Sequence, residues 1–443
     1  MSRTATVDAA FIESLVQDDR ENKVYRVNAN ILYTDPDIYE LELQHIYEGN
    51  WIYLAHESQI REPNDYLSLY MGRQPVILSR SADGGIACVA NRCTHRGARL
   101  CRGEKGNSSR FRCPYHGWSF RNDGLLVGIP DRGAYPANFS IEENSLLKVR
   151  AESYKGFIFG SLNPDVVPLE EYLGNAKPYL DLIVDKFPYG IEVTKGVTKY
   201  GYPGNWKIQA ENGLDGYHAQ FTHKSQFDAV NAFRLQKGAM GKDIKLRDHD
   251  DGIYLGRGHG VITDRRRVTE YRGQIGETLF ADNYPDDWAE RVGPVKSKWA
   301  REFLTHVLIW PNLLILETPT LQIRTLRPLS PTQTEVTGYA YAPVGQPEEY
   351  AARQLRQYVD FFGPLGNGTP DDLAIFTDCT EGYQVKSSPW NDLSRGIERE
   401  TTELDLCELG PIEYAGKPTD DTIYRGMYRW WVEYMKDRVS QGG

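Results

Sequence analysis

Two kinds of hydrophobic pattern follow one another along the chain. Up to residue 46 the apolar positions have mainly helical spacing, most clearly at 37–43. From Trp51 onward, short segments alternate between apolar and polar residues, as at 66–70, which is typical of strands. Turns with glycine or aspartate separate these segments, at Gly72, 83–85 and 122–124. The pattern predicts a helical arm followed by a small all-β unit that closes near 154–160.

Beyond residue 163 the pattern becomes mixed. Helices are expected at 169–185, 206–222, 348–362 and 424–438, and strands at 306–316, 321–327 and 334–343. The fold class is therefore α+β, with a β-rich module inserted before a larger α+β domain. The expected domains are 1–46 (an N-terminal arm packing with the larger domain), 47–163 and 164–443.

Composition and charge narrow the function classes. A chain of 443 residues exceeds a typical single core, and 40% hydrophobic with 25% charged residues is ordinary for a soluble protein. The net charge is −10, and the densest basic run, 265–267, is flanked by acidic residues and predicts a solvated surface turn. These features argue against nucleic-acid binding. Neither a signal pattern nor a membrane-length apolar stretch is present, so a soluble cytoplasmic protein is expected.

Cysteines are sparse, with six in the whole chain, which argues against a disulfide framework. Two of them lie in metal-ligand spacing. The others are expected to be buried thiols: Cys88, Cys101, Cys379 and Cys407.

Two short motifs each pair a cysteine with a histidine. Cys93 and His95 form C-x-H, and Cys113 and His116 form C-x-x-H. Zinc sites usually bring like ligands together in C-x₂₋₄-C and H-x₃₋₅-H spacings. Here each loop supplies one thiolate and one imidazole, so one iron can take both thiolates and the other both imidazoles. That sorting favours a Rieske [2Fe–2S] cluster over a structural zinc ribbon.

The residues around these motifs also bear on the redox potential. High-potential respiratory Rieske proteins have a further cysteine in each loop, and these form a disulfide. The matching positions here are Ala98 and Tyr115, so the bridge cannot form. The potential is expected near the low end of the roughly −150 to +300 mV range of Rieske clusters.

A second group of candidate ligands lies within 204–223. Asp215 and His218, three residues apart, would share a helix face. His218 and His223 are five apart and would diverge by about 140° on an ideal helix. For both to reach one metal, the helix must bulge or end between them. A mononuclear Fe(II) that activates O₂ usually has two histidines and one carboxylate.

The third ligand has no dictated spacing. Asp372 is a candidate, but Thr369 as N-cap, Pro370 as the first helical residue and Asp372 would also form an ordinary capping box. The other candidates are Asp371, Asp378 and Glu381.

With these motifs assembled, the sequence resembles the α subunit of Rieske non-heme iron ring-hydroxylating dioxygenases, in particular the benzoate, toluate and anthranilate group. The motifs are C-x-H-R-G, C-P-Y-H-G-W and N-G-x-D-G-Y-H-x₄-H. Further similar stretches lie at 48–60, 72–75, 152–166, 204–218, 322–344 and 368–373. The resemblance implies a catalytic domain of the helix-grip type, an antiparallel sheet with helices.

The resemblance also implies roles for individual residues. It implies cluster ligands Cys93, His95, Cys113 and His116, and iron ligands His218, His223 and Asp372. Asp215 matches a carboxylate that, in this family, links a cluster histidine (the partner subunit's His116) to an iron histidine (His218). Such head-to-tail contact implies a closed trimer, usually with a small β subunit (α3β3).

The implied activity is addition of both atoms of O₂ to a monocyclic aromatic substrate in aromatic catabolism. No G-x-G-x-x-G opens a βαβ unit, so electrons from NADH are expected through a separate reductase, with or without a ferredoxin. Between His223 and about Leu316 the sequence departs from benzoate-type enzymes. Benzoate-, anthranilate- and aniline-like substrates therefore stay open.

The alternatives are a Rieske monooxygenase of the salicylate hydroxylase type or a demethylase, a pure electron-transfer Rieske protein, and a zinc-stabilised binding module.

Overall fold

The computed structural model describes residues 7–236, 250–264, 285, 287–404 and 409–441. The chain forms two compact units: a larger unit of Met1–Glu42 with Leu173–Gly443, and a smaller unit of Leu43–Tyr172. The three domains expected from the sequence, with limits at 46 and 163, stay a prediction. The basic run at 265–267 and Cys407 lie outside the described residues. Within the described ranges, no helix is both long and apolar enough to cross a membrane.

The smaller unit is built from antiparallel strands. Seven strands pair in the order β3-β12-β11-β6-β5-β4-β7, and three in the order β10-β9-β8. Their bounds are β3 Ile52–His56, β4 Asp65–Met71, β5 Gln74–Arg80, β6 Ile86–Ala90, β7 Lys105–Asn107, β8 Arg110–Arg112, β9 Ser119–Arg121, β10 Leu126–Gly128, β11 Lys148–Tyr154 and β12 Phe157–Ser161. Short helical segments are η1 Leu43–Tyr47, η2 Glu57–Gln59, η3 Arg132–Ala134 and α4 Leu169–Leu173.

The hairpin of β4 and β5 shows how the sequence specifies this unit. Met71 pairs with Gln74, so Gly72 and Arg73 form a two-residue turn. Gly72 has φ of +54°, a left-handed conformation that glycine adopts without a Cβ penalty. The strand expected at 66–70 is therefore confirmed, together with the turn expected at Gly72.

The larger unit contains one large antiparallel sheet. Eight of its strands follow the order β13-β20-β19-β18-β17-β16-β15-β22, and β14 also pairs with β20. The bounds are β13 Ile191–Val193, β14 Thr198–Tyr202, β15 Gly252–Gly256, β16 His259–Asp264, β17 Leu304–Ile309, β18 Leu313–Leu316, β19 Gln322–Ser330, β20 Gln333–Pro343 and β22 Tyr414–Gly416. A smaller sheet contains β1 Val16–Asp19, β2 Val24–Asn28 and β21 Trp390–Asp392. The α+β class with an antiparallel sheet is confirmed.

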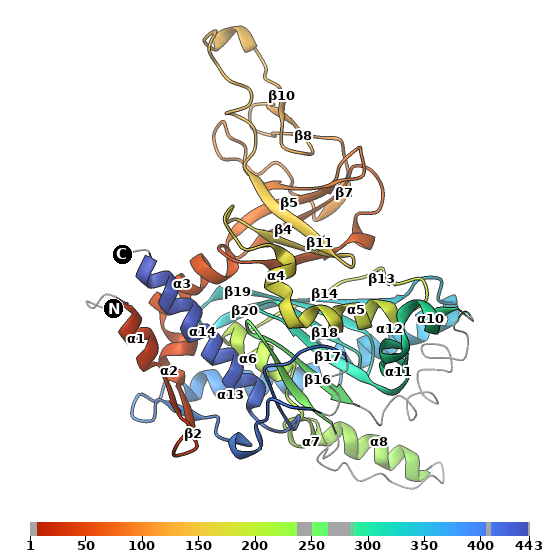
Figure 1. The fold of residues 1–443 in the computed structure, drawn as a ribbon. Helices are drawn as coiled ribbons and strands as arrows, with labels where there is room; N and C mark the ends of the chain where they lie inside the picture. The colour runs from red at the N-terminus through yellow and green to blue at the C-terminus, as the bar shows by residue number, and fades with distance from the viewer. Residues whose placement is uncertain (1–6, 237–249, 265–284, 286, 405–408, 442–443) are drawn as a thin grey trace. The chain divides into compact units, whose positions relative to one another are not determined.

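The larger unit also contains helical segments (Figure 1). They are α1 Ala9–Ser14, α2 Ala29–Thr34, α3 Pro36–Glu42, η4 Gly174–Ala176, α5 Lys177–Asp185, α6 Trp206–Asn212, α7 Ala219–Thr222, α8 Lys224–Gln236, α10 Trp288–Val292, α11 Pro294–Glu302, α12 Glu348–Phe362, α13 Thr369–Gly382, η5 Ile397–Arg399 and α14 Thr422–Gln441. α14 lies against β15 and β22, and α6 against β19. Gly426 allows the close approach of α14, since a Cβ there would clash with the Tyr254 ring.

The sequence-based elements were partly wrong in the N-terminal arm. The arm contains three short helices, but also the hairpin of β1 and β2, with Val16 opposite Val27. Tyr25 and Val27 are fully buried on one face of β2, while Arg26 between them is exposed. This period of two extends over only a few residues, and the surrounding helical pattern concealed it.

Two long helices expected from the sequence are broken. The one at 169–185 is divided into α4, η4 and α5, and Gly174 at the break has φ of +46°. The one at 206–222 ends at Asn212 and resumes only as the short α7. The segment at 306–316 is a hairpin of two strands rather than one. The strands at 321–327 and 334–343 and the helices at 348–362 and 424–438 are confirmed.

The cysteines outside the two motifs are only partly as expected. Cys88 and Cys101 are buried free thiols. Cys379 is half-buried, because it lies on α13 next to exposed positions, so the expectation of a buried thiol is wrong there.

Candidate metal centres

Cys93, His95, Cys113 and His116 lie on two loops of similar shape in the smaller unit. In the first loop, the Cys93 amide donates to the Ala98 carbonyl at 2.8 Å. In the second, the Cys113 amide donates to the Trp118 carbonyl at 2.7 Å. Each loop thus folds back on its cysteine and carries the histidine at its bend.

The rings of His95 and His116 lie edge to face, and their Nδ1 atoms are free. The ring centroids of His95 and His116 are 4.7 Å apart, and His95 stacks on Trp118 at 5.0 Å. Both Nδ1 atoms are buried, and neither has a hydrogen-bond partner among the described residues. Buried polar atoms are rarely left unpaired in native proteins, so two such atoms side by side fit a metal group.

The Cys93 and Cys113 thiols lie in the apolar core of the smaller unit. Cys93 is 1% exposed and Cys113 is 3% exposed. Burial raises the pKa of the Cys93 thiol. Burial also acts to raise the pKa of Cys113, but the amides of His116 and Tyr115 outweigh it, so this pKa is lowered. Two buried thiols and two free imidazole nitrogens match the donor set of a Rieske cluster.

The second constellation comes together in the larger unit. His218, His223 and Asp372 each offer a ligand atom, and these atoms lie within 4.8 Å of one another. The Asp372 Oδ1 atom is 3.3 Å from His223 Nε2 and 3.7 Å from His218 Nε2. Two imidazoles and one carboxylate in this arrangement fit mononuclear iron with open positions.

The end of α6 makes this geometry possible. Asn205 caps the start of the helix by accepting a hydrogen bond from the Lys207 amide at 3.1 Å. After Asn212 the chain leaves the helix, and His218 and His223 flank the four-residue α7. The helix therefore ends before both histidines, whereas the sequence predicted a bulge or an end between them.

Asp215 contacts His218, although the two do not share a helix face as expected. The Asp215 Oδ1 atom accepts hydrogen bonds from the amides of Tyr217 at 2.6 Å and His218 at 3.3 Å, as in an Asx turn. Its Oδ2 atom lies 3.3 Å from His218 Nδ1. Burial lowers the pKa of His218, but the bond to Asp215 and the charges of Asp215 and Asp372 outweigh this and raise it.

Asp371 contacts the outer nitrogen of His223, as Asp215 does that of His218. Its Oδ2 atom lies 3.4 Å from His223 Nδ1. Each imidazole thus has one nitrogen toward the triad and the other toward a carboxylate, the usual way of orienting metal-binding histidines. The sequence offered Asp371 only as an alternative ligand, not as an orienting group.

Asn212 is a site residue that the sequence reasoning missed. Its side-chain amide donates to Asp372 Oδ1 at 3.3 Å and lies 3.3 Å from His218 Nε2. Gln209 in turn donates to the Asn212 carbonyl oxygen at 3.3 Å. Burial raises the pKa of Asp372, opposed by His223, His218 and Arg324. The sequence signal that could have identified Asn212 was its position at the end of a helix, next to the histidine motif.

The capping box that the sequence allowed at 369–372 is not formed. Gly368, not Thr369, is the N-cap of α13, and no side chain caps it. The Thr369 hydroxyl instead donates to the Phe362 carbonyl at 3.1 Å. Asp378 and Glu381 are exposed and do not belong to the triad.

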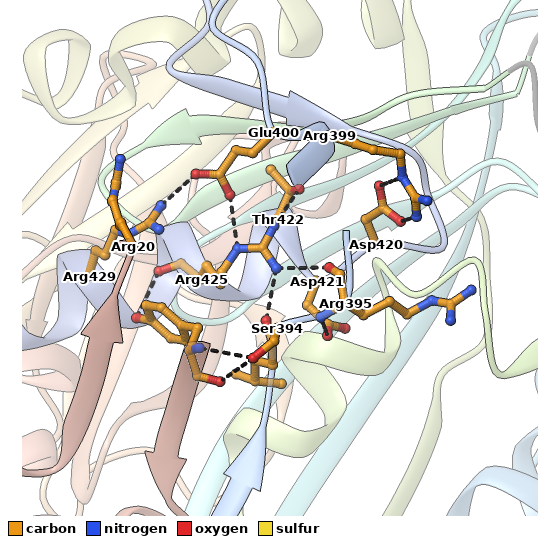
Figure 2. A network of polar contacts seen from close by, with 12 residues as sticks. Arg20, Ser394, Arg395, Arg399, Glu400, Asp420, Asp421, Thr422, Arg425 and Arg429 are labelled. Carbon is orange, nitrogen blue, oxygen red and sulfur yellow. Dashed lines mark hydrogen bonds and ion pairs between the residues drawn. The ribbon is translucent and has the colours of Figure 1, made fainter. Parts of the chain in front are cut away.

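A network of polar contacts surrounds Arg425 (Figure 2). Arg425 of α14 is fully buried and donates to Glu400 at 2.9 Å and to the carbonyls of Leu393 and Arg395 at 2.8 and 2.9 Å. The Arg395 guanidinium lies 4.0 Å from the centre of the Tyr217 ring. The network thus holds the Arg395 cation against the ring of Tyr217, which directly precedes His218.

Comparisons with known proteins match both parts of the chain. The family model described as "Ring hydroxylating alpha subunit (catalytic domain)" matches residues 170–437, and that described as "Rieske [2Fe-2S] domain" matches residues 50–146. Toluate 1,2-dioxygenase subunit alpha of Pseudomonas putida is 38% identical over 100% of this chain and 98% of its own length. The 2-halobenzoate 1,2-dioxygenase large subunit of Burkholderia cepacia is 36% identical over 96% of this chain and 92% of its own.

A solved structure is also similar. Naphthalene 1,2-dioxygenase from Rhodococcus sp., bound to indole, has a TM-score of 0.80 and 28% identity, covering 93% of this chain and 94% of its own. The similarity extends over both units.

Proposed function

The chain belongs to the ring-hydroxylating α-subunit family, and from this premise we propose that its substrate is a monocyclic aromatic acid of the benzoate type. The chain is the catalytic subunit of an aromatic-ring-hydroxylating dioxygenase, and its cofactors are a Rieske [2Fe–2S] cluster and a mononuclear iron. Two relatives with wide coverage are named for toluate and 2-halobenzoate, both aromatic carboxylates. The monooxygenase and demethylase alternative is not favoured.

The observation that carries the site assignment is the convergence of His218, His223 and Asp372. We assign these three side chains as ligands of the mononuclear iron. The cluster is assigned to Cys93, His95, Cys113 and His116, whose free Nδ1 atoms and buried thiols support it.

When bound, the iron supplies O₂ activation and leaves open positions for O₂ beside the substrate. The surrounding residues keep the ligands in place. Asp215 and Asp371 fix the orientation of the two imidazoles through their outer nitrogens. Asn212 holds the Asp372 carboxylate by a hydrogen bond. Phe361, whose ring lies 5.8 Å from that of His223, gives this side of the site an apolar surface suited to an aromatic ring.

The electron route and the partners are part of the proposal. Asp215 is proposed to connect the partner subunit's His116 to His218 in a closed trimer, with a small β subunit. Relatives named as α subunits support a multicomponent enzyme. An NADH-dependent reductase, directly or through a ferredoxin, is proposed to deliver the electrons, and the enzyme is proposed to be cytoplasmic because NADH is available there.

A labelled-oxygen experiment tests the function. The purified enzyme, a compatible reductase and NADH are supplied with ¹⁸O₂ and, in turn, benzoate, anthranilate, salicylate and aniline. We expect both labelled atoms in a cis-dihydrodiol or a product derived from it, with one of the carboxylates as the preferred substrate. Incorporation of a single atom would instead identify a monooxygenase, and preference for aniline would overturn the proposed substrate class.

A further inference from the structure

A buried carboxylate behind α6 is held between two tyrosine hydroxyls. Glu211 Oε1 accepts a hydrogen bond from Tyr33 of α2 at 2.7 Å and another from Tyr428 of α14. The two hydroxyl oxygens also lie in contact with one another, while each hydroxyl donates its single hydrogen to Glu211. Tyr33 is 2% exposed and Tyr428 is fully buried. Three elements far apart in the sequence thus form one phenol–carboxylate cluster.

This cluster lies next to the metal site. Glu211 directly precedes Asn212, whose amide contacts both Asp372 and His218. On the other side, the Tyr33 ring stacks on Tyr383 with centroids 4.6 Å apart and planes 14° apart. Tyr383 is only half-buried. A continuous series of oxidisable rings therefore runs from beside the metal site to a partly exposed tyrosine.

The charges around the cluster suit proton transfer from phenol to carboxylate. Burial raises the pKa of Glu211 to about 7, although Tyr428, Tyr33 and Lys207 oppose the rise. Asp215 adds to it. Close to neutral pH, a large share of Glu211 is therefore ionised and able to accept a proton.

The phenols themselves stay protonated until they are oxidised. Burial raises the pKa of Tyr33 and of Tyr428 well above their usual value, and Glu211 adds to both shifts. Burial also raises the pKa of Tyr383 and of the neighbouring Cys379 thiol. A neutral phenol becomes a far stronger acid when it loses an electron, so a base within hydrogen-bond distance makes that loss easier.

We propose that Tyr33 and Tyr428 form a one-electron donor site, with Glu211 as proton acceptor, that reduces activated oxygen when no substrate is oxidised. The inference rests on the proposed function, because that reaction supplies the oxidant. One phenol loses an electron to the activated oxygen and its proton to Glu211, leaving a neutral tyrosyl radical. An electron from Tyr383 then reduces this radical through the stacked rings, and Glu211 returns the proton to the phenol. Tyr383, which is half-buried, releases its own phenol proton to solvent, and a soluble thiol restores Tyr383 by giving up one hydrogen atom. The site protects the metal ligands from oxidation.

Rapid-freeze electron paramagnetic resonance tests this site. The reduced holoenzyme is mixed with O₂ without aromatic substrate, and oxygen consumption is measured on the same preparation. We expect a tyrosyl signal that narrows when the enzyme contains ring-deuterated tyrosine. The double variant Tyr33→Phe/Tyr428→Phe should lose at least nine-tenths of the signal, and Glu211→Gln should slow its formation severalfold. Spin trapping followed by peptide mapping of the native enzyme should locate the radical at these tyrosines or at Tyr383.

Tyr25→Phe is the matched control. Tyr25 is fully buried and its hydroxyl donates to the Arg425 carbonyl at 3.1 Å, in a network without Glu211. This variant should keep the full signal. Oxygen consumption without a tyrosyl signal, or an equal signal in the double variant, would overturn the donor site alone. Absence of oxygen consumption in the native enzyme loaded with both metals would also overturn the donor site, while the ¹⁸O₂ experiment with the aromatic acids tests the proposed function separately.

Discussion

The two metal centres of this chain are built in different ways. The four cluster candidates come from two neighbouring loops, and backbone hydrogen bonds within each loop set their positions. The triad instead joins His218 and His223, which flank α7, to Asp372 on α13, far along the chain. The first site depends mainly on local turns, and the second on the packing of helices against the sheet.

The surroundings differ as well. The inner nitrogens of His95 and His116 have no described partner, and the thiols below them lie in an apolar core. Around the triad, each histidine has its own outer carboxylate and Asp372 has the Asn212 amide. A site with such outer contacts is tuned by side chains that hold no metal themselves. The two centres should therefore respond independently to substitution, and only the triad should respond strongly to its outer contacts.

Removing a triad ligand is expected to have the largest effect. His223→Ala should lower turnover by more than about 100-fold, beyond the usual effect of an outer contact, because the iron loses a direct ligand. The visible absorption of the cluster should not change. Cys113→Ser is the reciprocal variant, and it should lose that absorption while the mononuclear iron is retained. Iron content, absorption and turnover check both, and loss of both metals from either variant would show that the centres are not independent.

Glu211→Gln should change how stability depends on pH. The folded pKa of about 7 lies above the usual value of 4.5, so the unfolded chain releases the proton first as pH rises. The contribution of Glu211 to stability is present below about pH 4.5 and falls by about 3 kcal/mol up to about pH 7. Glutamine cannot titrate and removes this slope. Urea unfolding from pH 5 to 8 should show the wild-type advantage shrinking with pH, and parallel profiles would contradict the prediction.

Asp215→Asn separates electron delivery from metal binding. If Asp215 connects the two centres between subunits, the variant should retain both metals, while single-turnover oxidation of the cluster slows by about 10- to 100-fold. Stopped-flow absorbance measures this rate. Asp371→Asn is the matched control, because Asp371 contacts the other histidine. Asp371→Asn should lower the affinity for iron, but in iron-loaded enzyme it should not slow oxidation of the cluster. Equal slowing in both variants would argue against a special role for Asp215.

Asn212→Ala should have a smaller effect on the same centre. Loss of the amide leaves Asp372 without its described hydrogen bond, which should weaken iron binding by about 10-fold. Competition with a chelator measures this. Gln209→Ala removes only the hydrogen bond from Gln209 to the Asn212 side chain, and it should weaken iron binding less than Asn212→Ala does. If Gln209→Ala matched or exceeded Asn212→Ala, the amide would not be the group that holds Asp372.

Much of the fold was accessible from the hydrophobic pattern. The alternating strands of the smaller unit, the strands β19 and β20 and the helix α12 follow directly from local periodicity. The β1–β2 hairpin was missed because its period of two is short and lies between helices. The helix expected at 206–222 was overextended, because apolar spacing does not reveal where α6 ends.

For the sites, the sequence by itself determined the cluster motif and the histidine pair, since each lies within a few residues and its spacing carries the geometry. The third ligand could not be chosen from spacing, because Asp371 and Asp372 are adjacent and both are acidic. The tertiary structure supports Asp372, because it turns Asp372 toward both histidines and Asp371 toward the outer nitrogen of His223. The same holds for Glu211, Tyr33 and Tyr428. Long-range packing brings them together, and no local pattern records which side chains will share a buried space.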